Sequence, residues 1–313
     1  MSSGSTETSR NSPLGMTAAT TAVVVWGVSS VAVKQVEGLN GIGIACYRIW
    51  LGAALVTAVY LVTGGRITRS LMRTSFLGGL TFTADLVLFF CAVQITSVAN
   101  ATIIGALQPV LVLIVAGPLF GERTRANEVV WGAVAIAGTA IVVLGGDGGG
   151  ANSVQGDLLA VGALIAWTAY FVCTKRARQT LSAFEYLTGM AMWAAVLVVP
   201  LPLIVEGSLG STTFRGWVLI VYLAVVNGLV GHFLMAKAHG HVRLLTISLL
   251  TLAIPVFSAA AAALLIDEPL TGVQVVGMVI VLSALAMVSM TAARRHPDLL
   301  DRDLEAIEAA PHP

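Results

Sequence analysis

Charged residues and cysteines are scarce in this sequence. Only 11% of its 313 residues are Asp, Glu, Lys or Arg, whereas 57% are hydrophobic. This composition excludes an ordinary soluble domain. The three cysteines, Cys46, Cys91 and Cys173, all fall inside apolar runs. An odd number without paired spacing predicts neither a disulfide framework nor a metal site, so we interpret them as small buried hydrophobes.

The motifs of membrane-embedded catalysis are missing as well. The chain contains no HExxH, no GxSxG and no cluster of aspartates. An enzyme acting on a lipid or isoprenoid substrate would need a nucleophile with its base, a zinc site or an aspartate-rich diphosphate site. A channel would usually present a filter motif, and none is visible. We therefore expect no catalytic residues, no metal and no cofactor, and the membrane-embedded enzyme is kept only as the alternative function.

Apolar runs of membrane length fill most of the chain. A bilayer core of about 30 Å needs about 20 mostly apolar residues per helix. The sequence predicts ten such spans, at residues 14–34, 42–63, 74–95, 98–120, 127–145, 156–174, 183–205, 217–236, 244–266 and 272–291.

The basic residues give these spans an orientation. With a cytoplasmic N-terminus, 14 of the 17 Lys and Arg residues fall in segments on the cytoplasmic side. Only Lys34 and Arg215 lie on the opposite side, and Arg48 lies within a span. This positive-inside bias favours ten spans with both termini in the cytoplasm. The richness in Ala, Val and Gly and the predominance of Arg over Lys are typical of a bacterium with a GC-rich genome. We therefore expect a multi-pass protein of the plasma (inner) membrane.

The two halves of the chain repeat one another. Residues 15–35 align with 156–176 without a gap, and the Pro-to-Glu interval is 13 residues in both copies. Because each half holds five spans, the second half must enter the membrane upside down. The fold prediction is therefore an all-α membrane protein with ten transmembrane helices as two inverted five-helix repeats. The matched residues are Trp26 and Trp167, Lys34 and Lys175, Pro109 and Pro255, and Glu122 and Glu268.

The repeat divides the chain into five parts. The expected order is a disordered cytoplasmic N-terminus (1–13), the first repeat (14–146), a Gly-rich linker (147–155), the second repeat (156–291) and a cytoplasmic tail (292–313).

The pattern resembles the EamA branch of the drug/metabolite transporter superfamily. The resemblance shows in the helices of Trp26 and Trp167, in CYRIWLGAALV around Arg48, in TSVANATIIGALQPV followed by GERTRANEVVWGA, and in DEPLTGVQVVG. It extends over about residues 15–290. The resemblance implies a ten-helix transporter whose cavity is lined by the first four helices of each half, and it favours export of a small metabolite, amino acid, sugar or drug.

Ionisable side chains inside spans are costly and are therefore the first candidates for function. Arg48 could bind a substrate carboxylate through its planar guanidinium, or it could form a structural ion pair or reach the headgroups. Asp85 could carry a proton, or it could pair permanently with Arg48 or form a hydrogen bond to a neighbouring helix. His232 could titrate near neutral pH, or it could simply pack in the bundle.

Uncharged polar and aromatic residues are a second group of candidates for substrate binding. Each could contact substrate, or it could pack against a neighbouring helix. In the first repeat Gln108 precedes the proline, whereas in the second repeat Ile254 does. A polar substrate is therefore expected to bind mainly to the first half of the chain. Pro109 and Pro255 are candidate hinges, with static kinks as the alternative. The uncharged polar and aromatic candidates for substrate binding are Trp26, Ser29, Ser30, Gln108, Trp167, Tyr170 and Asn227.

These observations predict a secondary transporter that moves a small organic solute by alternating access. No nucleotide-binding domain is apparent, so a gradient is expected to drive transport. The expected partners are the solute and the lipid bilayer, with no nucleic acid. Proton coupling through Asp85 and His232 is a hypothesis, and a homodimer is left open.

Overall fold

A computed structural model describes residues 12–96, 98–146, 153–201 and 209–293. Within these ranges every regular element is helical, in agreement with the all-α prediction. The expected disordered segment 1–13, the linker 147–155 and the tail 292–313 fall largely outside the described residues.

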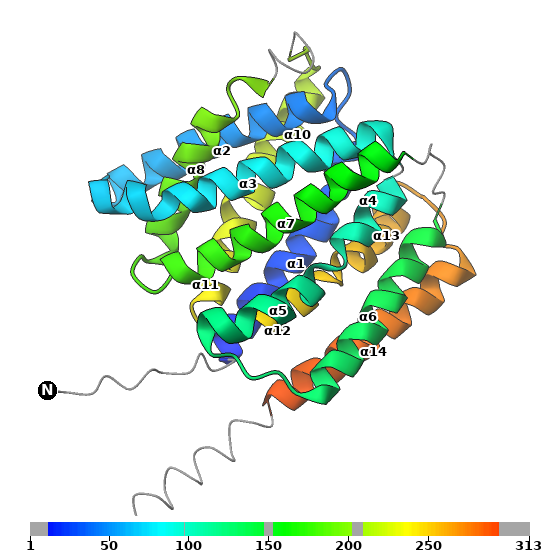
Figure 1. Cartoon of the computed structure of the whole chain (residues 1–313). Helices are drawn as coiled ribbons and strands as arrows, with labels where there is room; N and C mark the ends of the chain where they lie inside the picture. The colour runs from blue at the N-terminus through cyan, green and yellow to red at the C-terminus, as the bar shows by residue number, and fades with distance from the viewer. Residues whose placement is uncertain (1–11, 97, 147–152, 202–208, 294–313) are drawn as a thin grey trace, which may run out of the picture.

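The helices follow one another along the chain and are labelled in Figure 1. They are α1 (Pro13–Lys34), α2 (Gly41–Val62), α3 (Arg69–Ile95), α4 (Val98–Gly105), α5 (Gln108–Phe120), α6 (Ala126–Leu144), α7 (Val154–Ala177), α8 (Ala183–Leu197), α10 (Phe214–Tyr222), the π-helix η1 (Leu223–Gly231), α11 (His232–His239), α12 (Leu244–Thr251), α13 (Ile254–Leu265) and α14 (Gly272–Ala293).

Eight helical stretches of the described part are long and apolar enough to cross a membrane. The 27-residue α3 and the shorter apolar α8 are not counted among these eight. The eight stretches are Pro13–Lys34, Gly41–Val62, Asn100–Phe120, Ala126–Leu144, Val154–Ala177, Phe214–His239, Leu244–Leu265 and Gly272–Met290.

Polar residues cap the helices where a loop gives way to an apolar run. The side chains of Ser12, Asn40 and Thr68 each accept a hydrogen bond from the backbone N–H three residues later, at 2.8–3.1 Å. Such caps satisfy backbone donors that the first turn leaves without a partner. The Thr68 cap also explains why α3 begins at Arg69, five residues before the expected start of that span at residue 74.

The two repeated prolines stand directly after breaks in the helices. α4 ends at Gly105 and α5 begins at Gln108, while α12 ends at Thr251 and α13 begins at Ile254. Pro109 and Pro255 each occupy the first turn of the second segment, where no backbone N–H is needed. The sequence predicts a kink at each proline, and the structure has an interruption just before it.

The chain ends of the described bundle lie together. α1 begins and α14 ends at the same end of the bundle, as does the α11–α12 connection (Figure 1). There the backbone N–H of Ser12 donates to the carbonyl of His241 at 3.1 Å. The α1–α2 and α13–α14 connections lie at the opposite end (Figure 1).

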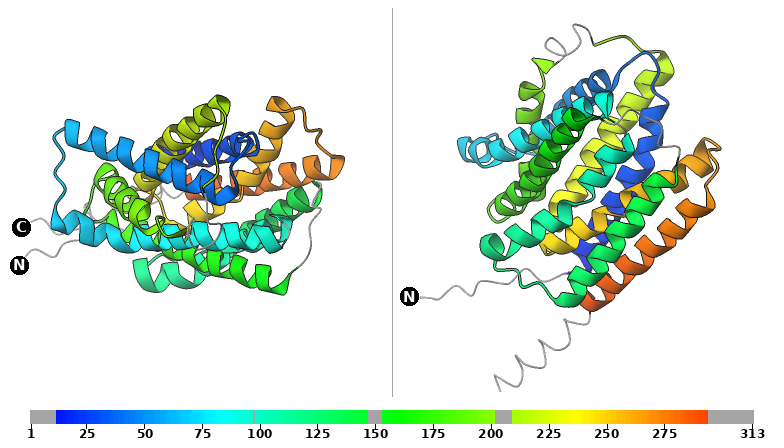
Figure 2. Two further views of the ribbon diagram at one scale, coloured as in Figure 1. Left: turned by 90° about the horizontal axis from the view of Figure 1, so that it is seen from above. Right: turned by 45° about the vertical axis from the view of Figure 1, so that its right-hand side comes forward.

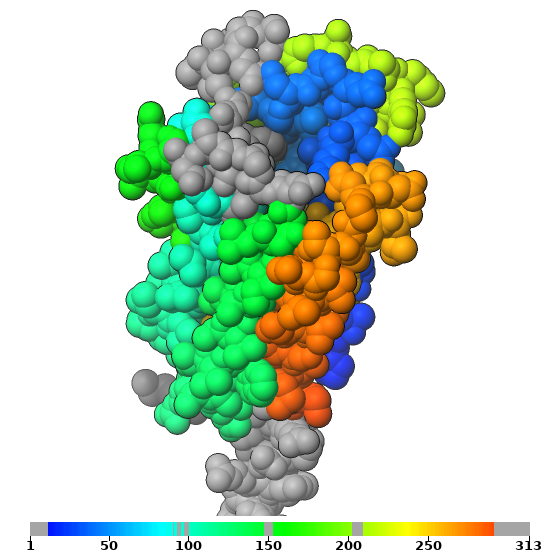
Figure 3. All heavy atoms as spheres, turned by 90° about the vertical axis from the view of Figure 1, so that its right-hand side faces the viewer, coloured from blue at the N-terminus to red at the C-terminus, as the bar shows by residue number. Residues whose placement is uncertain are grey.

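α6 and α14 pack side by side along one edge of the bundle (Figures 1 and 2). The same two helices form neighbouring ridges on the face shown in Figure 3. Glycines bring them close, because a Cβ on Gly138 would lie 2.8 Å from Ile280 and a Cβ on Gly277 would lie 2.8 Å from the backbone nitrogen of Val142. Small residues at such contacts let helix backbones approach within lipid.

This contact gives a first prediction. The Gly277→Ala substitution should lower the melting temperature, because overpacking against rigid backbone destabilises by about 1–3 kcal/mol. Gly272→Ala, at the start of the same helix, is the matched control, since its Cβ would meet nothing within 4 Å. Thermal unfolding of both variants in nanodiscs checks the prediction, and equal melting temperatures would contradict it.

Candidate functional site

A cavity in which the centre of a water molecule can occupy about 250 Å³ lies in the bundle, and both halves of the chain line it. Seven of the ten sequence candidates meet here, including all three ionisable residues. Phe82, Leu86 and Phe89 line it too, although the sequence analysis did not single them out. The full lining is Trp26, Arg48, Phe82, Asp85, Leu86, Phe89, Trp167, Tyr170, Asn227 and His232.

A sequence signal existed for the three residues that were missed. Phe82, Leu86 and Phe89 stand three residues before, one after and four after Asp85 on α3. Positions three or four apart share one face of a helix. The face that carries Asp85 into the cavity therefore carries two phenylalanines with it.

Three sequence candidates lie outside the cavity lining. Ser29 is buried, and its hydroxyl has no hydrogen-bond partner within the described ranges. Ser30 contacts Ser258 of α13, with 2.5 Å between the two Oγ atoms. Gln108 is fully buried at the break of its helix, where its Oε1 accepts a hydrogen bond from Thr251 Oγ1 at 3.4 Å. The last two contacts join the halves of the chain to each other.

Gln108 therefore does not bias the cavity toward the first half. The polar lining comes from both halves, with Arg48 and Asp85 from the first and Asn227 and His232 from the second.

The guanidinium of Arg48 is held from the second half of the chain. Its Nη1 donates to Asn227 Oδ1 at 3.0 Å. Asn227 belongs to η1, and π-helical turns occur frequently at functional sites. Because a guanidinium has five N–H donors, this single hydrogen bond leaves most of them for other partners.

Asp85 faces the same cavity as Arg48. No ion pair joins the two side chains in the part of the chain that the structure describes, and no hydrogen bond to Asp85 is formed there. Both side chains are partly buried, and a charge withdrawn from water is costly, so a ligand group of opposite charge would stabilise each of them.

Aromatic rings hold His232 in place. Its Nδ1 lies 3.2 Å from the Tyr170 hydroxyl, and its ring centroid lies 5.0 Å from that of Trp26 and 5.1 Å from that of Phe82. Gly231 makes the approach of Trp26 possible, because a Cβ there would lie 2.6 Å from Trp26 Nε1. The result is a rigid aromatic wall beside the two charged residues.

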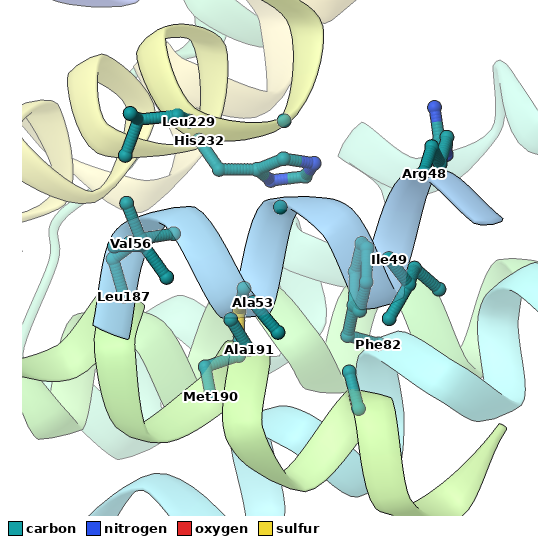
Figure 4. A pocket seen from close by; sticks show the side chains of 13 residues that line it. Arg48, Ile49, Ala53, Val56, Phe82, Leu187, Met190, Ala191, Leu229 and His232 are labelled. Atoms are coloured by element: carbon teal, nitrogen blue, oxygen red, sulfur yellow. The ribbon is translucent and has the colours of Figure 1, made fainter. Parts of the chain in front are cut away.

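A small apolar hollow, in which the centre of a water molecule can occupy about 40 Å³, continues from this cavity (Figure 4). It shares Arg48, Phe82 and His232 with the polar cavity. The remaining lining residues are Ile49, Gly52, Ala53, Val56, Leu187, Met190, Ala191, Ala194, Gly228 and Leu229.

Two ion pairs connect the halves at opposite ends of the bundle. Lys175 lies 3.1 Å from Glu122, and both side chains are about 5% exposed. Lys34 lies 2.8 Å from Glu268, and these side chains are 57% and 50% exposed. The sequence repeat aligns the two lysines with each other and the two glutamates with each other. Related positions therefore form the same contact, buried at one end and exposed to solvent at the other.

The buried glutamate also caps a helix. Glu122 accepts hydrogen bonds from the backbone N–H groups of Leu244 at 2.8 Å and Leu245 at 3.4 Å, in the first turn of α12. A carboxylate at a helix N-terminus satisfies free donors and complements the helix dipole.

Comparison with protein families decides the class of this molecule. Residues 13–144 and 154–290 match the EamA-like transporter family, which is nearly all of the described chain. The chain belongs to this family. The EamA assignment confirms the predicted resemblance and the predicted transport of small solutes across a membrane by a multi-pass protein. It also excludes the alternative of a membrane-embedded enzyme.

Two curated relatives of this EamA transporter cover most of its length. A "Probable amino-acid metabolite efflux pump" of Escherichia coli (strain K12) is 27% identical over 279 residues, covering 84% of this chain and 90% of the relative. The "Aromatic amino acid exporter YddG" of Ancylobacter novellus is 23% identical over 286 residues, covering 88% and 96%.

The EamA chain also resembles a solved structure. One crystal structure aligns with a TM-score of 0.78 at 19% sequence identity, covering 90% of this chain and 98% of the other. At this level of identity the similarity shows the fold alone.

Proposed function

We propose that this EamA transporter exports an amino acid across the inner membrane. The observation that carries the proposal is the presence of one cation, Arg48, and one anion, Asp85, in the same cavity without an ion pair between them. An amino acid presents a carboxylate and an ammonium group on adjacent atoms. It can therefore satisfy both residues at once, and the names of the two curated relatives support this class of solute.

The chemistry of the two contacts differs. The guanidinium of Arg48 can bind a carboxylate with two parallel hydrogen bonds, while Asn227 fixes its orientation from behind. Asp85 accepts from the ammonium group. The rings of Trp26, Trp167 and Tyr170 surround this head group, and aromatic faces attract a cation within about 6 Å.

The architecture we propose is ten transmembrane helices in two inverted five-helix repeats, with both termini in the cytoplasm. Three observations support it: the matched helix breaks before Pro109 and Pro255, the matched ion pairs at opposite ends, and the shared position of the first and last described helix ends. The alternation of basic residues favours the orientation.

Alternating access follows from this symmetry. The cavity lies between the halves, so tilting one half against the other would open it to one side at a time. We place the bending at the two helix breaks, which Gln108 and Thr251 bring into contact. The ion pairs Glu122–Lys175 and Lys34–Glu268 then hold the two ends of the cavity.

Counterflow in proteoliposomes tests the proposed function. Vesicles loaded with an unlabelled amino acid should accumulate the same labelled amino acid, while the matching amine and the matching carboxylic acid should fail to exchange. Exchange of neither amino acids nor their metabolites would overturn the proposal.

A proton is the coupling ion in this proposal, carried by Asp85 and His232. Across the cavity these groups face Arg48 and Tyr170. Acidifying the outside of the vesicle should speed efflux, and Asp85→Asn should remove this dependence while leaving the fold intact. A transport rate that does not depend on the pH gradient would exclude proton coupling. The homodimer stays a prediction, which crosslinking in membranes would test.

A further inference from the structure

We propose that the apolar hollow beside the cavity is a side-chain subsite, and that it selects amino acids whose side chains are apolar and carry no hydrogen-bonding group. The inference rests on the proposed function and adds to it the chemical class of the substrate. Leucine, isoleucine, valine, methionine and phenylalanine are the natural amino acids that fit this description best.

Two stripes of residues form the walls of the hollow. On α2 the lining residues are Ile49, Gly52, Ala53 and Val56, and on α8 they are Leu187, Met190, Ala191 and Ala194. Both sets follow the spacing that places side chains on one face of a helix. The two faces therefore oppose each other, as Figure 4 shows, and η1 closes the space with Gly228 and Leu229.

Small residues create the space. Glycine or alanine occupies five of the lining positions, on three different elements. Larger side chains at these positions would fill the hollow, and an interior normally leaves few voids of this size. The five positions are Gly52, Ala53, Ala191, Ala194 and Gly228.

Eight of the thirteen residues that line the hollow are buried, while Gly52, Ala191, Gly228 and Leu229 are partly exposed. Val56 is 1% exposed, Leu187 and Met190 are each 3% exposed, and Ala194 is fully buried. The residues it shares with the polar cavity are Arg48, Phe82 and His232, so its mouth is at the head-group site.

The position of Arg48 sets the direction of the substrate. Arg48 directly precedes the α2 stripe, and in Figure 4 its side chain points away from the apolar walls. A substrate whose carboxylate binds this guanidinium therefore has its α-carbon at the mouth of the hollow. Its side chain can extend between α2 and α8 without moving the head group.

The lining also determines what is rejected. Apart from the two polar residues at the mouth, every lining side chain is apolar or absent. A lysine or glutamate side chain would lose its hydration there without a partner, and the tyrosine hydroxyl and tryptophan N–H would be left without one too. These substrates should bind more weakly than their size suggests.

Affinity across a series of amino acids tests the subsite. Binding is measured by calorimetry in nanodiscs for alanine, valine, leucine, methionine, tyrosine and lysine. In the wild type each added methylene should improve affinity about fourfold, the value that corresponds to the usual transfer free energy of a methylene group. Tyrosine and lysine should bind no better than alanine.

Filling the hollow should abolish this preference. In Ala53→Leu the new side chain occupies the space, so leucine and methionine should bind no better than alanine. Ala54→Leu is the matched control on the same helix. Ala54 lies outside the hollow and lines only the neighbouring groove with Thr57 and Leu61, whereas Ala53 lines both. Its affinity series should match that of the wild type. Ala191→Leu fills the same space from α8 and replaces Ala53→Leu if that variant does not fold.

The outcomes separate the two proposals. If alanine and leucine bind the wild type equally, or if Ala54→Leu changes the series as much as Ala53→Leu does, the subsite is wrong and the amino-acid site survives. If tyrosine binds as tightly as leucine, the subsite is also wrong. If no amino acid binds or exchanges, the proposed function fails and the subsite fails with it.

Discussion

Replacing Arg48 by alanine should lower amino-acid affinity by roughly 100-fold, the largest binding effect we expect from a single substitution. Truncating one partner of a buried, hydrogen-bonded charge pair costs about 2–5 kcal/mol. Among the described residues that line the cavity, Arg48 is the only Lys or Arg, so the variant would also leave the Asp85 carboxylate beside the substrate carboxylate without it. Like charges would then face each other at close range.

Arg48→Lys separates the role of charge from the role of shape. Lysine keeps the positive charge but loses the planar arrangement of donors that matches a carboxylate. Arg48→Lys should restore part of the affinity. Calorimetric titration of the wild type, Arg48→Ala and Arg48→Lys with leucine ranks their affinities. If Arg48→Ala kept full affinity, Arg48 would have a structural role only, through its hydrogen bond to Asn227.

The sequence could predict the helices and the charged candidates for clear physical reasons. Membrane-length apolar runs leave few alternatives to a helix, since lipid offers no partner for backbone hydrogen bonds. Arg48, Asp85 and His232 stand out because ionisable groups in such runs are rare. All three line one cavity in the structure.

The contacts between helices could not be predicted from the sequence. In a membrane protein both the lipid-facing and the inward-facing sides of a helix are apolar, so periodicity does not mark the inner face. Nothing in the sequence distinguishes Asn227, which binds Arg48 across 179 positions, from Gln108, which lies buried at a helix break. The π-helix that carries Asn227 leaves no simple sequence signature either, so the contact of Asn227 with Arg48 needed the structure.

Glu122→Gln should destabilise the protein far more than Glu268→Gln, although the two substitutions are chemically identical at positions that the repeat aligns. Breaking a buried ion pair by removing one charge costs about 3–5 kcal/mol, because the other charge stays behind without a counterion. The Lys175 side chain is about 5% exposed, and its Nζ otherwise donates to the Val242 carbonyl at 2.7 Å.

The Lys34–Glu268 pair is the matched control that the chain itself provides. Its side chains are more than half exposed on average, and ion pairs in water contribute about 0–1 kcal/mol. Thermal unfolding of the two variants under the same conditions measures the difference. Similar losses at both sites would contradict the asymmetry.

A double variant shows whether the effect comes from the stranded charge or from the missing helix cap. Lys175→Met in the background of Glu122→Gln removes the buried ammonium group that has lost this carboxylate, so it should recover much of the lost stability. If the loss persisted, the hydrogen bonds from Glu122 to Leu244 and Leu245 would be its main cause. Recovery would show that charge burial makes this end of the bundle the more strongly held of the two, since the related contact at the other end lies in solvent and can separate at little cost.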